Sequence, residues 1–99
     1  IEEEKIEIAK RFLIPRQLEE SGFEAGELVF DDEAIKKIVR EYTYEAGVRN
    51  LEREIGRLCR KQARLKSEKK KLVDTLSVKS VEKFLGPPQF FMTEAERQD

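Results

Sequence analysis

Five arginines share one side of a stretch whose other side is apolar, and they are the residues best suited to chemistry in this 99-residue chain. At about 100° per residue they fall within an arc of about 80°. They are Arg49, Arg53, Arg57, Arg60 and Arg64. A guanidinium group is planar and permanently charged, and its paired N–H groups fit phosphate or carboxylate oxygens. The pattern therefore indicates anion binding, either to a ligand or to acidic groups of the same domain.

Arg49 differs from the other four arginines because it comes two residues after Gly47. Glycine is expected where a preceding helix ends and the chain turns in a left-handed conformation. A new helix beginning at this corner would hold Arg49 in its first turn, where its side chain projects toward a partner surface. An arginine on an exposed helix face is more often solvated or in an ion pair. From spacing alone, both interpretations of Arg49 stay open.

The composition excludes several kinds of catalytic site. The chain has no histidine and one cysteine, Cys59, so it lacks the usual zinc sites and every Ser-His or Cys-His pair. It also lacks a glycine-rich phosphate-binding loop. Neighbouring carboxylates occur, but they stand where helix ends and caps favour acids. We therefore expect no metal site, and no catalysis by this chain alone.

The single cysteine and the distribution of apolar residues indicate where in the cell the protein would function. Cys59 falls on the apolar side of its stretch and has no intrachain partner, which favours a buried thiol and a reducing compartment such as the cytoplasm. No apolar run approaches the length of about 20 residues that a membrane span needs. We expect a cytoplasmic protein without a membrane partner.

Residues 48–72 form a basic segment, with ten basic and three acidic residues, in an otherwise acidic chain of net charge −1. Such a segment could contact the phosphates of duplex DNA without reading its sequence. The candidate contacts are Arg57, Arg60, Lys61, Arg64, Lys69, Lys70 and Lys71. Because the lysine run also fits a solvated helix end, the structural alternative stays open.

The elements that must position these side chains are mainly helices. An apolar stripe predicts a helix from residue 48 to about residue 65, and its members are Val48, Leu51, Ile55, Leu58, Cys59, Gln62 and Leu65. Further helices are predicted over residues 2–14, over residues 32–44 and between Ser77 and Gly86. Short apolar runs at residues 28–30 and 73–76 are candidate strands. The fold class is therefore mainly α, a small bundle of about four helices with a short two-stranded β-ribbon.

Three local features of these elements can be predicted. The first helix should have a broad apolar face made of Ile6, Ile8, Ala9, Phe12 and Leu13. Pro15 should either kink that helix or begin a short second helix that ends at Gly22. Asp31 and Ser77 are the expected N-caps of the helices that follow them.

Three segments of the chain resemble a known family. The sequence E-A-G-V-R-N-L-E-R-E-I at Glu45–Ile55 is similar to the sensor-2 segment of AAA+ ATPases. With I-A-K-R-F-L-I-P-R-Q-L at Ile8–Leu18 and F-L-G-P-P-Q-F at Phe84–Phe90, it resembles the small α-helical subdomain of the ATP-dependent protease Lon. The resemblance extends from residue 1 to about residue 90, with the segments in the same order.

The resemblance implies a function for the whole segment. Residues 1–86 would form a lid over a large nucleotide-binding subdomain, which would hold most of the ATP and Mg²⁺, and residues 87–99 would lead to a protease domain. Arg49 would match the sensor-2 arginine and sense the γ-phosphate. Glu45, Gly47 and Arg53 would support it or lie at an interface. The chain would then be a piece of a ring-forming, homo-oligomeric serine-type endopeptidase that unfolds and degrades proteins.

Two other functions remain as alternatives. One is the DNA contact through the basic helix described above, which does not depend on the resemblance. The other is binding of substrate polypeptides through Phe90, Phe91 and Met92. These three residues could equally belong to a linker that packs on the protease domain.

Overall fold

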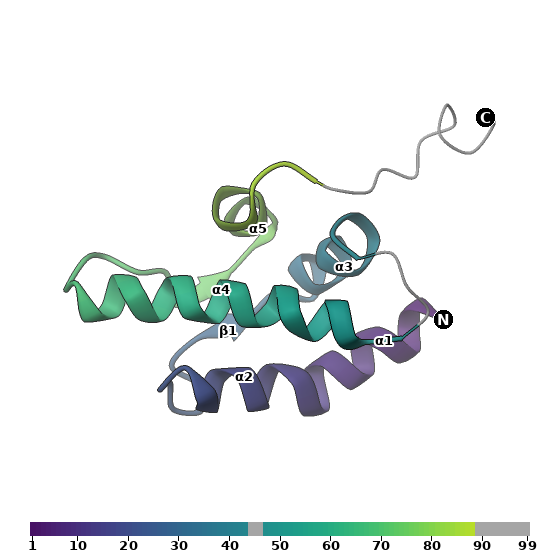
Figure 1. Ribbon diagram of the computed structural model, residues 1–99, viewed down its shortest axis with the longest axis horizontal. Helices are drawn as coiled ribbons and strands as arrows, with labels where there is room; N and C mark the ends of the chain where they lie inside the picture. The colour runs from purple at the N-terminus through teal and green to yellow at the C-terminus, as the bar shows by residue number, and fades with distance from the viewer. Residues whose placement is uncertain (44–46, 89–99) are drawn as a thin grey trace.

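Five α-helices and a pair of two-residue strands make up the computed structural model, which describes residues 1–43 and 47–88. In chain order the elements are α1 (Glu2–Ile8), the π-helical turn η1 (Ala9–Leu13), α2 (Ile14–Glu20), β1 (Val29–Phe30), α3 (Asp32–Glu41), α4 (Arg49–Ser67), β2 (Thr75–Leu76) and α5 (Val78–Leu85). Helix α4 crosses the middle of the molecule, with η1 and α2 on one side and α3 and α5 on the other (Figure 1). The predicted fold class is confirmed.

The first helix passes through Pro15 instead of stopping there. Residues 2–20 are helical without interruption, and η1 ends at Leu13, two positions before the proline. Proline lacks the N–H that would bond to the carbonyl four residues earlier, and a wider π-helical turn is one way to accommodate that loss. The wide turn buries Ala9 and Leu13, whereas Phe12 is 58% exposed. The prediction that Phe12 lies on the buried face was therefore wrong.

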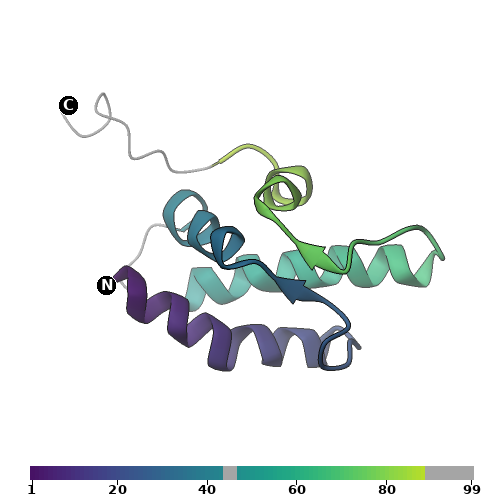
Figure 2. The same cartoon turned by 180° about the vertical axis from the view of Figure 1, so that it is seen from behind.

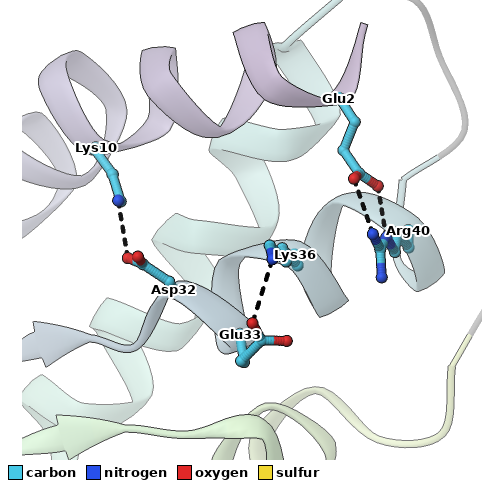
Figure 3. Close-up of polar contacts among 6 residues, drawn as sticks. All are labelled: Glu2, Lys10, Asp32, Glu33, Lys36 and Arg40. Carbon is cyan, nitrogen blue, oxygen red and sulfur yellow. Dashed lines mark hydrogen bonds and ion pairs between the residues drawn. The ribbon is translucent and has the colours of Figure 1, made fainter.

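Ion pairs connect the first helix to α3, as Figure 3 shows. Lys10 Nζ lies 2.9 Å from Asp32 Oδ1, and Arg40 Nη2 donates to Glu2 Oε1 at 2.9 Å. The hydrogen bond from Arg40 lowers the pKa of Glu2 below its usual value. Because most of these side chains are exposed, each pair adds little stability, but together they orient the two helices.

The two candidate strands form a parallel pair. Val29 is opposite Thr75 and Phe30 is opposite Leu76. The Val29 N–H donates to the Asp74 carbonyl and the Asp31 N–H donates to the Leu76 carbonyl, both at 2.9 Å. Phe30 and Leu76 face the core. A pair this short depends on the helices beneath it (Figure 2).

Side chains fix the ends of α5. Ser77 Oγ accepts a hydrogen bond from the Ser80 N–H at 3.4 Å, so the predicted N-cap is confirmed. At the other end, Gly86 adopts φ +87°, a conformation that favours glycine. Tyr42 Oη donates to the Gly86 carbonyl at 2.6 Å, and Lys61 Nζ donates to the Phe84 carbonyl at 2.6 Å. Asp31 occupies the N-cap position of α3, but its side chain makes no capping hydrogen bond.

Helix α4 supplies the centre of the core. The predicted stripe is buried at Leu51, Ile55, Leu58, Cys59 and Gln62 and half-buried at both of its ends. No helix within the described ranges, 1–43 and 47–88, is long and apolar enough to cross a membrane. Burial raises the pKa of the Cys59 thiol to about 12. This thiol is therefore protonated at neutral pH and closed to solvent.

The folded chain is expected to resist alkylation at Cys59. Iodoacetamide reacts with exposed thiolates. The Cys59 side chain is buried, and its raised pKa keeps the thiol protonated at the pH of the reaction. At pH 8, intact-mass measurements should show no adduct in buffer and complete reaction in denaturing urea. Rapid modification in buffer would contradict the burial of this side chain.

Candidate functional site

The predicted break before Arg49 is present. Helix α3 ends at Glu41, and Gly47 and Val48 are not helical. Helix α4 then begins at Arg49. Glu45 lies outside the described residues. The backbone angle φ of Gly47 depends on residue 46, which also lies outside them, so the left-handed corner stays a prediction.

Arg49 occupies the first turn of α4 and is exposed to solvent. Within residues 1–43 and 47–88, its guanidinium group makes no hydrogen bond and no ion pair. The N-cap residue Val48 offers no side-chain oxygen to the N–H groups of the first turn. The first turn of α4 therefore carries both the positive end of the helix dipole and a guanidinium group that has no partner in the described residues, and both favour an anion.

Three side chains fix this end of α4 against α2. Arg16 Nε donates to Glu52 Oε2 at 2.7 Å, and Arg16 Nη2 donates to Glu52 Oε1 at 3.0 Å. Gln17 Nε2 also donates to Glu52 Oε2, at 2.9 Å. The hydrogen bonds from Arg16, and then from Gln17, lower the pKa of Glu52. We call Arg16, Gln17 and Glu52 the Glu52 clamp.

The Glu52 clamp was not predicted from the sequence. In the sequence, Glu52 lies 36 residues after Arg16 and 35 residues after Gln17, so no local periodicity connects it to them. A usable signal was present, because Arg16 and Glu52 lie in two of the segments that carry the family resemblance. Opposite charges in two such segments are candidates for a contact.

Gly56 allows α2 to approach α4 closely. A methyl group at this position would lie 2.6 Å from Gln17 Oε1 and 2.9 Å from Arg60 Nη1. Glycine inside a helix costs about 0.5–1 kcal/mol relative to alanine. Both opposing atoms are the ends of flexible side chains, so they can move away.

The effect of Gly56→Ala is expected to depend on Gln17. In the wild-type chain, the helix gain and the displacement of the Gln17 amide should offset each other to within about 1 kcal/mol. In a Gln17→Ala chain only the flexible end of Arg60 remains near the new methyl group, and the same substitution should add about 0.5–1 kcal/mol of stability. Urea unfolding of the four chains measures this difference. Equal effects in both backgrounds would show that the Gln17 contact does not matter.

Several other basic side chains are engaged within the chain. Arg57 Nη1 donates to Glu54 Oε1 at 2.9 Å, and Arg64 Nε donates to Glu68 Oε2 at 3.1 Å. Lys70 Nζ lies 3.2 Å from Glu68 Oε1. Lys61 is held by the end of α5, as described above. Only some of the residues predicted to contact DNA are therefore without a partner in the described part of the chain.

The uncommitted basic side chains lie along α4 and just beyond its end. Between residues 53 and 71, the basic side chains that make neither an ion pair nor a hydrogen bond within the described part of the chain are those of Arg53, Arg60, Lys69 and Lys71. Lys69 adopts φ +59° where the chain leaves α4. The arginine row predicted from the helical wheel thus divides into paired and unpaired members.

Comparison with known proteins identifies the family. The family described as Lon protease AAA+ ATPase lid domain matches residues 19–75. The Lon protease of Lawsonia intracellularis is 48% identical over 96 residues, which are 97% of this chain and 12% of that protein. The Lon protease of Geobacter metallireducens is 53% identical over 89 residues, which are 90% of this chain and 11% of that protein. The chain therefore spans about one eighth of the length of these relatives.

A solved structure supports the same assignment. The SSD domain of Bacillus subtilis Lon protease superposes with a TM-score of 0.70 at 40% identity. The match covers 92% of this chain and 96% of that one. The family match exceeds half of the chain and the fold agrees, so the chain belongs to the Lon protease AAA+ ATPase lid domain family.

Proposed function

We propose that residues 1–86 act as the ATPase lid of a Lon-type ATP-dependent protease, and that Arg49 senses the terminal phosphate of ATP. The observation that carries this proposal is the exposed guanidinium group of Arg49, which has no partner within residues 1–43 and 47–88 and lies at the start of a helix packed against α2. These features fit a polyphosphate, because a cation and a helix N-terminus face the same space. ATP would supply a γ-phosphate that is lost on hydrolysis.

Arg49 would couple the nucleotide state to the lid through a difference in affinity. A ligand shifts a conformational equilibrium only by as much as it binds one state better than the other. A hydrogen bond to a charged group contributes about 1.5–3 kcal/mol, which corresponds to roughly a 10- to 150-fold change in an equilibrium. A contact made to the γ-phosphate and absent with ADP would favour the closed lid by that amount.

The binding preference for a γ-phosphate tests this proposal. Kd values for ATPγS and for ADP should be measured on the full-length parent protein and on its Arg49→Ala variant. We expect the substitution to weaken ATPγS binding by roughly 10- to 150-fold and to change ADP binding much less. Arg60→Ala is the matched control, since Arg60 is also exposed and has no ion pair within residues 1–43 and 47–88, but lies about three turns further along α4. An unchanged preference in the Arg49 variant would reject the proposal.

The remaining activities belong to the longer polypeptide in this proposal. Relatives named Lon protease extend far beyond the matched segment, which supports a longer parent protein with protease activity. In this proposal that parent is a homo-oligomeric ring that unfolds and degrades proteins. Residues 87–99 would lead from the lid to the protease domain. Phe90, Phe91 and Met92 lie outside the described residues, so substrate binding through them stays a prediction. The cytoplasmic location proposed from composition also stays a prediction.

DNA binding is the second candidate function. It is favoured by Arg60, Lys69 and Lys71, which have no partner in the described part of the chain. It is weakened by the ion pairs of Arg57 and Arg64. A gel shift of the 99-residue chain with duplex DNA should appear at low salt and decrease at moderate salt. No shift at low salt would reject this function and leave the lid proposal intact.

A further inference from the structure

Glu52 is the natural intrahelical partner of Arg49, because the two residues are three positions apart on α4. Comparable pairs form further along α4 and at its C-cap. Arg57 pairs with Glu54 at 2.9 Å, and Arg64 pairs with Glu68 at 3.1 Å. Arg49 has an acid at a suitable spacing and yet no ion pair within residues 1–43 and 47–88.

The Glu52 clamp explains this difference. Both oxygens of the Glu52 carboxylate already accept hydrogen bonds from α2, two from Arg16 and one from Gln17, at 2.7–3.0 Å. The pair with Arg16 is bidentate, the geometry in which a guanidinium group binds a carboxylate most specifically. A carboxylate held in this way points toward α2, and its charge is compensated before a ligand arrives.

We infer that Arg16 is a positioning residue: it binds Glu52 and thereby leaves the Arg49 guanidinium group available for phosphate. This inference rests on the proposed function of Arg49. Arg16 need not touch the nucleotide to affect its binding. It acts by preventing an ion pair that would occupy Arg49, and by neutralising a carboxylate one helical turn from the phosphate-binding position.

Loss of Arg16 should therefore impair Arg49 without damaging the fold. The freed Glu52 carboxylate could pair with Arg49 and would repel a polyphosphate. An exposed ion pair on a helix and an uncompensated charge nearby each change an equilibrium a few-fold, so about a three- to tenfold loss of ATPγS affinity is expected. The loss should shrink at high salt, because salt screens exposed charges. Arg16 is more than half exposed, so its removal should leave folding nearly unchanged.

A rescue experiment separates this role from a structural one. ATPγS and ADP affinities should be measured on the full-length parent with Arg16→Met, with Glu52→Gln, and with both substitutions. Arg16→Met alone should lose ATPγS affinity. Adding Glu52→Gln should restore it to within about twofold of wild type, because the competing carboxylate is gone. If Arg16 merely held two helices together, removing its partner as well would restore nothing.

Two controls complete the design. Arg11→Met removes an exposed arginine that pairs with Glu7 at 3.3 Å on the same long helix, and it should leave ATPγS affinity unchanged. In an Arg49→Ala background, Arg16→Met should have a smaller effect than in the wild-type background, because the competing ion pair is missing and only repulsion by the freed Glu52 carboxylate remains. Circular dichroism of the variant 99-residue chains checks that each variant folds.

The outcomes distinguish the positioning role of Arg16 from the proposed phosphate-sensing role of Arg49. If Arg49→Ala weakens ATPγS binding but Arg16→Met does not, the positioning role is overturned and the lid proposal stands. Failure of Glu52→Gln to rescue Arg16→Met overturns the positioning role in the same way. If Arg49→Ala leaves ATPγS binding unchanged, both the proposed function and the role of Arg16 are wrong.

Discussion

Replacing Arg49 by alanine is expected to lower ATP hydrolysis by the full-length parent about 10- to 1,000-fold and to abolish most of its ATP-dependent proteolysis. A preorganised cation that stabilises charge developing on a phosphoryl group contributes to rate as well as to binding. Arginine fingers in GTPases contribute about 10³- to 10⁵-fold, and a sensing arginine within the same chain should contribute less. Steady-state ATPase and degradation of an unfolded protein, measured on the same preparation, test this expectation.

The Arg49→Ala effect should be specific to function. Arg49 is exposed and has no partner in the described part of the chain, so the unfolding free energy of the 99-residue chain should change by less than about 0.5 kcal/mol. Arg49→Lys keeps the charge but loses the planar fork, and it should recover only part of the activity. A variant that unfolds at much lower urea concentration would show that Arg49 has a structural role instead.

Replacing Gln62 by methionine is expected to stabilise the chain by about 1–3 kcal/mol. Gln62 is fully buried, and neither Nε2 nor Oε1 has a hydrogen-bond partner in the described residues. An unpaired buried amide loses its hydration without compensation, at a cost of about 1–3 kcal/mol. Methionine has a similar shape and removes that cost. The measurement is urea unfolding of the two chains at the same pH.

A second substitution at Gln62 separates the effect of removing the polar amide from the effect of losing packed volume on the free energy of unfolding. Gln62→Ala also removes the amide but leaves a cavity in the core, so it should gain less stability than Gln62→Met or lose stability. If Gln62→Met itself lowered the unfolding free energy, the amide must have a partner in solution. That result would contradict the description of this part of the core.

The regular part of the fold follows from local sequence. The apolar stripe of α4, the helix break before Arg49 and the Ser77 cap all depend on residues close together in the chain, and the structure contains each of them. The pairing of the two strands was also predictable, because few other segments could form strands. Their parallel direction was not predicted from local sequence.

The exceptions arise where side chains distant in sequence decide the outcome. Phe12 was misplaced because periodicity assumes a regular α-helix, whereas the chain widens into a π-helical turn before Pro15. The helical wheel placed the arginines on one face, but it could not show that Arg57 pairs with Glu54 whereas Arg49 pairs with nothing in the described residues. Those choices depend on the rotamers of individual acids and on contacts such as the Glu52 clamp.

The most direct test of the central claim is a structure of the full-length parent protein bound to ATPγS. We expect the Arg49 guanidinium group to lie within hydrogen-bonding distance, about 2.7–3.2 Å, of a γ-phosphate oxygen, with Glu52 still bound to Arg16. A nucleotide-bound structure in which Arg49 points to solvent, or pairs with Glu52 while another residue contacts the γ-phosphate, would contradict the account.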